Sequence, residues 1–314
     1  MTLAVFYDNN DNSDDIFVHD GEMNLNDRQL RLLVSAHIAS ALKGKTDTET
    51  LIENSFTVPP ASGLGSNVKN ILAAKLGSDG SALGLLICLN KTAGDFNTID
   101  MNIHDLVAGQ TSGFLSNRSM FMEMQDLFMG VLSALAATID AKDAYTGRHS
   151  DRVANLSQEI ALRSGLLRED QIRNIHLAGM LHDIGKIAVP EHILTKPGKV
   201  TEEEFNELKK HPKKGADILK GIKRLDEIST AILTHHERYD GKGYPRGLAG
   251  EDIPLAGRII CLADSFDAMA SNRPYRNALP MEIVRAEIEK GAGTQFDPRL
   301  AKITLSLDLE QFTA

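Results

Sequence analysis

The stretch LHDIGK at residues 181–186 constrains this chain more than any other part of its sequence. A histidine and an aspartate stand side by side there, at the end of a run with the apolar spacing of a helix. Imidazole and carboxylate groups together suit borderline divalent metals such as iron, manganese or zinc. More residues of these types lie elsewhere in helical or turn contexts that could converge: His149, His211, His235, His236 and Asp264. A lone His-Asp pair is a weak signal, but the whole set favours a metal centre.

Composition excludes several classes of protein. A length of 314 residues favours two domains, and 42% hydrophobic residues are enough for real cores. The net charge of −9 argues against a general binder of DNA or RNA, although a local basic pocket could still hold a small anion. Cys88 and Cys261 each lie in an apolar run, so we expect buried thiols without a disulfide. No apolar run reaches the length of a membrane span and no signal peptide is visible, so we expect a cytoplasmic protein.

The first hundred residues are predicted to form a small α/β domain. Strand-like runs at 2–7 and 16–19 precede a helical pattern at 26–43, and a loop rich in Pro, Gly and Ser covers 56–67. Two further strand-like runs, 70–76 and 82–90, are joined by a predicted hairpin.

This part of the chain resembles the second half of a GAF domain. In that family a strand pair is followed by a phenylalanine, an acidic residue and a helix that leaves the domain, which here are Phe96, Asp100 and the helix from about Ile103. Another small α/β sensor or dimerisation module is the alternative.

Residues 103–142 contain no proline and predict one long helix or two in tandem. Met120, Phe121, Met124, Phe128 and Val131 form an apolar stripe on it. The stripe predicts a packing seam between domains or protomers and favours a homodimer. We place a regulatory domain at 1–118 and a second domain at 119–314, with this helix as the link.

The C-terminal half is all-helical apart from its loops. Helical patterns are followed by a loop that ends at Thr201, an N-cap with Glu204 three residues later. The later helices are expected at 201–210, 214–224, 225–237, 256–270, 280–290 and 298–305. The expected fold class is therefore α+β with two domains: a small GAF-like α/β domain and an all-α helical bundle.

Two features of the candidate ligands can be argued from the residues themselves. Neighbours on a helix point about 100° apart, so His235 and His236 reach one metal site only over the edge or end of their helix. Asp264 lies in an apolar helix, where an unpaired carboxylate is costly and should hold a cation. A salt bridge to Arg258 or Arg273 is the alternative for Asp264. Asp267, one turn later, suits a structural or supporting role better.

Longer motifs identify the family that the C-terminal half resembles. HDIGK at 182–186, HHERYDGKGYP at 235–245, ADSFDAM, NRPYR and GTQFDP at 293–298 resemble the HD-GYP branch of the HD phosphohydrolases, from about 132 to 301. The resemblance implies an HD-type helical bundle. It also implies a metal-dependent phosphodiesterase that hydrolyses cyclic di-GMP to pGpG, to GMP, or to both.

The resemblance also implies a centre with two divalent metals. One would be held by His149, His182, Asp183 and Asp264, and the other by Asp183, His211, His235 and His236, with Asp183 bridging. Some relatives bind a third metal through a glutamate where this chain has Tyr145, so we expect two. Arg148 replaces the glycine that is usual before His149. We expect iron, with manganese as the alternative.

Two metals would polarise the phosphodiester and convert a bridging water to hydroxide, so Asp183 and Lys186 are the expected catalytic residues. Lys186 would also bind one phosphate, and Arg273 and Arg276 the other. A solvated surface arginine is the alternative for Arg276. Tyr244 would line the substrate pocket or help to present the GYP loop to GGDEF-type diguanylate cyclases.

Two other functions are alternatives to the hydrolysis of cyclic di-GMP. One is a catalytically weak or silenced receptor or scaffold for cyclic dinucleotides, and the other is a hydrolase of a different cyclic dinucleotide.

Overall fold

The computed structural model describes residues 2–6, 16–20, 29, 33–42, 50–56, 68–78, 81–142, 148–196, 198–222, 225–272 and 277–313. The chain divides into two compact units, Met1–Asp126 and Leu127–Ala314. The outline of the expected fold is confirmed, because a small antiparallel sheet near the N-terminus is followed by a part whose described elements are helices, apart from one isolated β-bridge. The expected loop at 57–67 and hairpin tip at 79–80 lie outside the described residues.

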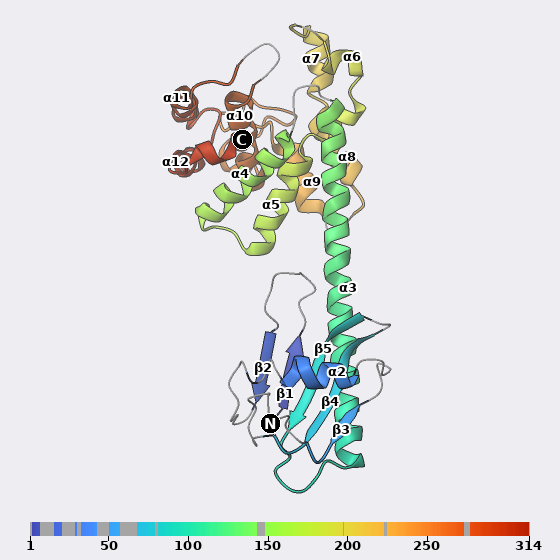
Figure 1. The fold of residues 1–314 in the computed structure, drawn as a ribbon. Coiled ribbons are helices and arrows are strands. Elements are labelled where there is room, and N and C mark those ends of the chain that lie inside the picture. Colours follow the sequence, from blue (N-terminus) through green and yellow to red (C-terminus); the bar gives the residue numbers. More distant parts are fainter. Residues whose placement is uncertain are drawn as a thin grey trace. The chain divides into compact units, whose positions relative to one another are not determined.

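The N-terminal unit is built on a five-stranded antiparallel sheet with strand order β2-β1-β5-β4-β3 (Figure 1). Its strands are β1 Thr2–Phe6, β2 Ile16–Asp20, β3 Leu51–Glu53, β4 Ile71–Ser78 and β5 Ser81–Leu89. The short β3 was not predicted, because three residues carry too little alternation to be read as a strand. β4 and β5 each extend or shift by one or two residues relative to the expected runs.

Helices cover both faces of this sheet. Side chains of a strand alternate between its faces, and Ile71 and Ala73 of β4 pack with Ile38 and Leu42. Ile38 is the last residue of a π-helical stretch, Leu33–Ile38, and Leu42 is the last residue of α2, Ala39–Leu42. Ala74 and Leu76 point to the other face and pack against Ala108 and Leu115 of α3.

The predicted linking helix is one continuous helix, α3, from Thr98 to Lys142. It begins five residues before the expected start because Asn97 caps it: the side-chain oxygen of Asn97 accepts the backbone N–H groups of Ile99 and Asp100 at 2.9 and 3.2 Å. Among the described helices, α3 alone is long and apolar enough to cross a membrane, with a mean hydropathy of 1.2 over its best 18-residue window. Helices of soluble proteins reach this length and hydropathy too, so α3 is only weak evidence against the expectation that the chain has no membrane span.

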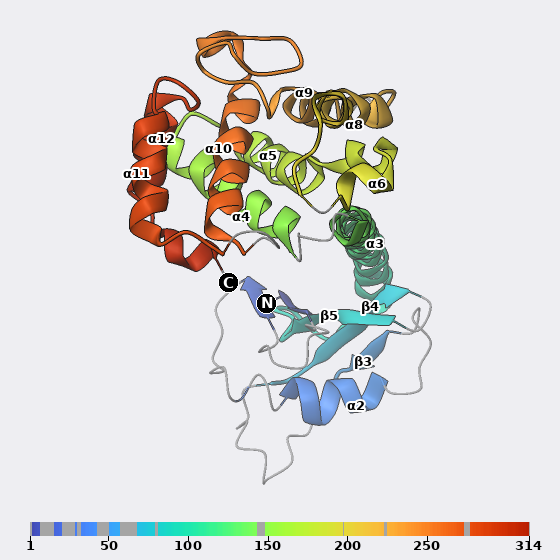
Figure 2. The ribbon, with the colours of Figure 1, turned by 90° about the horizontal axis from the view of Figure 1, so that it is seen from above.

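The C-terminal unit contains helices only, apart from one isolated bridge between Ala292 and Phe296 in the described residues. Its α-helices are α4 His149–Ser164, α5 Glu169–Leu181, α6 Glu191–Leu194, α7 Glu202–Leu208, α8 His211–Leu219, α9 Asp226–Thr234, α10 Leu255–Ala270, α11 Met281–Gly291 and α12 Pro298–Leu305. Figure 2 shows α10 between the α11–α12 pair and α4–α5. Ile259, Leu262 and Phe266 of α10 are almost completely buried, so this helix forms the centre of the core.

Local signals explain most helix boundaries in this unit. The expected cap at Thr201 is confirmed, since its hydroxyl accepts the N–H of Glu204 and the Glu204 carboxylate accepts the N–H of Thr201. Helix α6 lies inside the stretch that was expected to be loop. α8 begins at His211, three residues early, with Pro212 in its first turn, where a missing N–H costs nothing.

Candidate metal centre

Three buried residues from two helix ends form the first candidate metal cluster: His149, His182 and Asp183. His149 begins α4, and His182 and Asp183 follow the last residue of α5. One ligand atom from each lies within 4.8 Å of the others. The Nε2 atoms of His149 and His182 are 3.3 Å apart, and Asp183 Oδ2 lies 3.8 and 3.4 Å from them.

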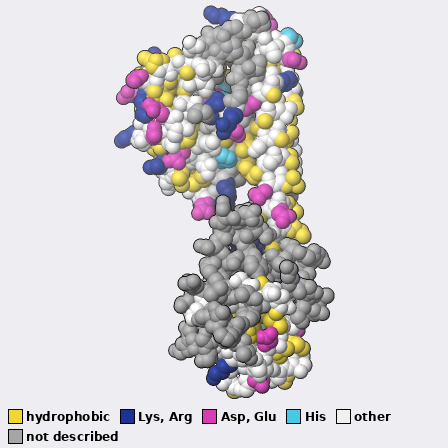
Figure 3. All heavy atoms as spheres, viewed as in Figure 1, with side chains coloured by type: hydrophobic (Ala, Val, Ile, Leu, Met, Phe, Trp, Pro, Cys, Tyr) yellow, Lys and Arg dark blue, Asp and Glu magenta, His cyan; other side chains and the backbone are white. Residues whose placement is uncertain are grey.

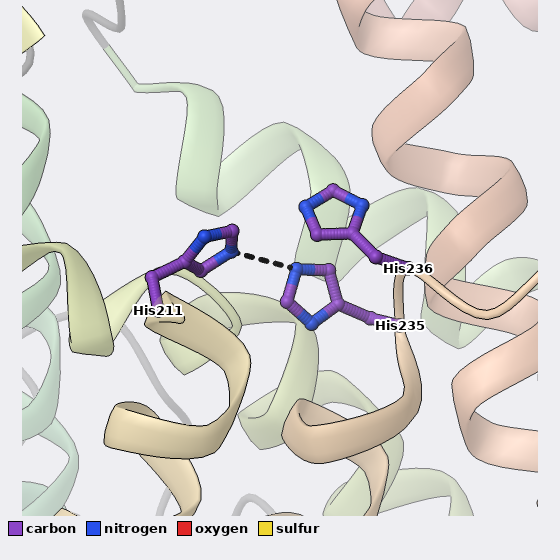
Figure 4. Close-up of side chains that lie close together, drawn as sticks. All are labelled: His211, His235 and His236. Atoms are coloured by element: carbon purple, nitrogen blue, oxygen red, sulfur yellow. Dashed lines mark hydrogen bonds between the residues drawn. The ribbon is translucent and has the colours of Figure 1, made fainter. Parts of the chain in front are cut away.

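A second cluster consists of His211, His235 and His236, with ligand atoms again within 4.8 Å (Figure 4). His211 is the first residue of α8, while His235 and His236 lie in the turn that follows α9. The expectation that helix 225–237 carries the last two is therefore wrong: α9 ends at Thr234. The turn explains how adjacent histidines face one site, since the two rings are not held 100° apart by helical geometry.

The histidine rings are oriented by hydrogen bonds to their other nitrogen. The Nδ1 atoms of His182, His211 and His235 lie 2.7, 2.8 and 2.6 Å from backbone carbonyl oxygens in the preceding helical turn. A neutral ring that donates from Nδ1 keeps its proton there, so its Nε2 carries a lone pair. The Nε2 atoms of His211 and His235 are only 3.3 Å apart (dashed line in Figure 4). Two lone pairs at this distance repel unless a cation lies between them, so these residues fit a metal ion.

His149 is oriented by a carboxylate instead. Its Nδ1 lies 2.7 Å from Asp267 Oδ2, and Asp267 in turn accepts hydrogen bonds from Arg152 at 2.5 and 3.1 Å. Burial opposes ionisation of Asp267, but His149 and Arg152 outweigh it and lower the pKa of Asp267 to about 2. Asp267 is thus positioned for the supporting role expected of it, because it orients the ring of the candidate ligand His149. Arg152 was missed, because its position on the same helical face as His149 gives no separate signal in the sequence.

Asp183 lies between the two clusters. Its Oδ2 faces His149 and His182, whereas its Oδ1 lies 3.2 Å from Nε2 of His211 in the second cluster. A carboxylate with one oxygen toward each of two ligand sets can bridge two cations. The arrangement depends on Gly185: a Cβ there would overlap the carbonyl oxygen of His211, so only glycine lets the 3₁₀ turn Ile184–Ala188 pack directly on α8.

Asp264 of α10 lies beside the first cluster. Its Oδ1 is 3.5 Å from Nε2 of His149 and 3.9 Å from Nε2 of His182. The alternative partner Arg258 pairs with Asp297 at 2.5 Å instead, and Arg273 lies outside the described residues. Asp264 is therefore placed to complete the first ligand set.

The electrostatics of the two clusters differ. Burial opposes protonation of His182, but the Asp183 and Asp264 carboxylates outweigh it and raise the pKa of His182 to about 9. The first cluster thus attracts positive charge, as a cation site should. In the second cluster burial and neighbouring histidines lower the pKa of His236 to about 3 and that of His235 well below its usual value. These rings stay neutral, which is the form that binds metals.

Two of the predicted substrate-binding residues, Lys186 and Tyr244, lie next to the two clusters. Lys186 Nζ lies 2.7 Å from Asp183 Oδ2. The ring of Tyr244 packs on His236 with centroids 4.8 Å apart, and the Lys209 ammonium lies over the Tyr244 ring at 5.8 Å. Arg273 and Arg276, like Tyr145, lie outside the described residues.

The loop that carries Tyr244 is held by the residue after the histidine pair. Glu237 is buried, and its carboxylate accepts the backbone N–H groups of Arg246 and Leu248 at 2.7 and 3.1 Å. Gly243 runs so close to the backbone of Glu237 and Arg238 that a side chain would not fit. These contacts fix the loop beside His236.

This helical unit thus brings together one cluster of two histidines and an aspartate and one cluster of three histidines, and each cluster could hold a metal ion. A family model described as "HD domain" matches residues 133–300, which is more than half of the chain. The chain therefore belongs to the HD-domain family.

Several curated relatives that are named as cyclic dinucleotide phosphodiesterases support the resemblance to HD-GYP proteins. The cyclic di-GMP phosphodiesterase response regulator RpfG of Xanthomonas campestris is 44% identical over 179 residues, covering 56% of this chain and 47% of the relative. A cyclic di-GMP phosphodiesterase of Thermotoga maritima is 43% identical over 192 residues, covering 60% and 52%. The 3'3'-cGAMP-specific phosphodiesterase 2 of Vibrio cholerae is 37% identical over 193 residues, covering 60% and 36%. The chain spans about half or less of the length of these relatives.

Proposed function

We propose that this protein hydrolyses a phosphodiester bond of cyclic di-GMP, giving pGpG, GMP or both. The observation that carries the proposal is the position of Asp183, with one carboxylate oxygen toward each histidine cluster. Two divalent cations, iron first and manganese as the alternative, would supply Lewis acidity and lower the pKa of a bound water. His149, His182 and Asp264 would hold one cation, His211, His235 and His236 the other, and Asp183 both.

The chain's own residues would orient the substrate. Lys186 offers a fixed positive charge next to Asp183 and can donate to a non-bridging phosphoryl oxygen, where negative charge grows in the transition state. Tyr244 packs on His236, which supports a place in the wall of the substrate pocket over a role in presenting the loop to GGDEF-type partners. Arg273 and Arg276 stay proposed ligands of the second phosphate.

A second substrate has support of its own. The relative from Vibrio cholerae that is named a 3'3'-cGAMP-specific phosphodiesterase is 37% identical over 193 residues. A hydrolase for this mixed cyclic dinucleotide would use the same centre and differ in the contacts to one base.

We further propose that residues 1–118 form a GAF-like regulatory domain and that 119–314 form the catalytic domain. The five-stranded antiparallel sheet with helices on both faces supports a sensor module of this kind. The continuity of α3 from one unit into the other supports its role as the connection.

The test combines metal content and turnover on one sample. The protein is purified without oxygen, iron, manganese and zinc are counted per chain, and cyclic di-GMP and 3'3'-cGAMP are followed by chromatography. We expect about two metals per chain and a linear product, with Asp183→Asn and His182→Ala reducing turnover at least about 100-fold. The exposed residues His192 and Asp170 provide matched controls, His192→Ala and Asp170→Asn, which should keep wild-type turnover. Metal-loaded protein that leaves both dinucleotides intact would contradict the proposal and favour a receptor.

A further inference from the structure

The exposed side of α3 carries a seven-residue repeat. Pairs of neighbouring residues recur at 106–107, 113–114, 120–121, 127–128 and 134–135, and they read LV, GF, MF, LF and AL. We call these five pairs the heptad face. Its phenylalanines, Phe114, Phe121 and Phe128, stand seven residues apart and are 67%, 57% and 46% exposed. Figure 3 shows part of this face as a line of hydrophobic side chains along α3. A contiguous apolar surface of this kind marks an interaction site.

We infer that the heptad face pairs with the same face of a second copy of the chain, in parallel and in register. A straight helix drifts by about 20° per heptad, so a strict seven-residue repeat keeps one seam only when two helices wind around each other. Other apolar partners do not require the repeat. The inference rests on α3 alone and is independent of the proposed function.

The composition of the face suits pairing with itself. Parallel, in-register pairing places each residue opposite its own copy. Neither the heptad face nor the intervening positions 103, 110, 117, 124 and 131 carry an acidic or basic residue, so identical residues do not repel there. Asn117 occupies the position that Met124 and Val131 take in the next heptads, and a buried asparagine at this position fixes register in two-stranded coiled coils.

The size of the face matches a stable dimer. Its eight large apolar side chains are each about half exposed or more, which corresponds to on the order of 100 Å² per side chain. Together they would bury about 800 Å² per chain, the usual contribution of one partner to a specific interface.

A lipid bilayer fits this helix less well than a second copy does. Glu123 and Asp126 are exposed in the middle of the apolar stretch, and a bilayer would have to accept both carboxylates. Towards its C-terminal end, Leu132, Ala136 and Ile139 already pack in the core of the C-terminal unit.

The oligomeric state of the full chain tests the inference. Sedimentation equilibrium should give a mass of two chains, and Phe121→Glu should raise the dimer dissociation constant at least about 100-fold because each chain would place a carboxylate against an apolar seam. Met122→Glu is the matched control: Met122 is 53% exposed on the same turn but lies outside the heptad face, so the dimer should persist. A wild-type far-ultraviolet circular dichroism spectrum of both variants would show that they fold.

A crosslinking experiment tests direction and register. In a Cys88→Ser background, Asn117→Cys should form a disulfide-linked dimer under mild oxidation, whereas Met122→Cys should not. A monomeric wild type overturns the inference. Vesicle binding would also overturn it. If the wild-type chain floats with phosphatidylcholine–phosphatidylglycerol vesicles and Phe121→Glu abolishes the flotation, the heptad face binds a membrane instead. Equal crosslinking at both positions would overturn the parallel register.

Discussion

Asp140, two residues before the end of α3, accepts hydrogen bonds from Ser150, at 2.8 Å from its hydroxyl and 3.2 Å from its backbone N–H. Ser150 follows His149, so the last turn of α3 holds the start of the helix that carries a candidate metal ligand. Lys142, in the same turn, donates to the carbonyl oxygens of Ile187 and Val189 at 3.0 Å each. These residues follow Lys186, so the end of α3 contacts two segments of the candidate site.

Removing the Asp140 carboxylate should loosen His149. We expect Asp140→Ala and Ser150→Ala each to weaken metal binding about 10-fold, because supporting contacts outside the ligand set typically contribute this much. The double variant should be no worse than Asp140→Ala alone, since that change already removes the hydrogen bond that Ser150→Ala removes. Metal titration of the apo-protein measures the effect, and Asp126→Ala, an exposed acidic residue of α3, is the control. Fully additive losses would show that the two residues act separately.

Asp267 should matter to metal binding without being a ligand. Asp267→Asn loses the charge that holds the Nδ1 proton of His149, so we expect metal affinity to fall about 10- to 100-fold. Substrate KM should change little, and turnover should recover when the metal concentration is raised. A loss of turnover that excess metal does not restore would contradict this supporting role.

Arg148 is strained, and glycine should relieve it. Its φ of 60° lies in the left-handed region, which costs a residue with a side chain about 1–2 kcal/mol. Arg148→Gly removes this cost but adds flexibility to the unfolded chain, so we expect a net gain of about 0.5–1 kcal/mol in unfolding free energy. Urea denaturation of the C-terminal unit, followed by hydrogen exchange of α4 peptides, measures it. Arg173→Gly, within helix α5, should destabilise instead.

His104 should make the N-terminal unit sensitive to acid. It is 4% exposed, and burial lowers its pKa although Asp105 and a hydrogen bond to the backbone of Leu86 act in the opposite sense. The unfolded chain therefore takes up a proton first as the pH falls through about 6.5, and stability drops.

His104→Leu removes this uptake. The variant should lose less stability than the wild type between pH 7 and pH 5, because it has no buried imidazole whose pKa differs between the folded and unfolded chain. Amide protection of β4 and β5, corrected for the pH dependence of intrinsic exchange, measures the difference. His192→Leu, an exposed histidine of the other unit, should leave the pH profile unchanged; a parallel profile for His104→Leu would refute the account.

The type of fold and the set of candidate ligands can be predicted from the sequence because both depend on local sequence patterns. The 3.6-residue spacing of apolar residues and the Thr201 cap are readable without tertiary structure, and motifs fix which histidines to consider. The end of α9 before His235 was not readable, because the turn is set by packing of Glu237 under the following loop. The pairing of Arg258 with Asp297, 39 residues apart, likewise needs three dimensions.

The contact between Gly185 and the backbone of His211 has a consequence for how the centre is filled. The packing of Gly185 on the backbone of His211 limits how far Asp183 and His211 can separate. A centre of the proposed kind is then assembled before loading, and the ion enters a cage of fixed size. Such a cage selects ions by radius, so the choice among divalent ions of similar radius depends on the ligand types and on metal availability. The ion found in the protein would therefore depend on the supply in its surroundings when the centre is loaded, and the same chain could work with different metals in different conditions.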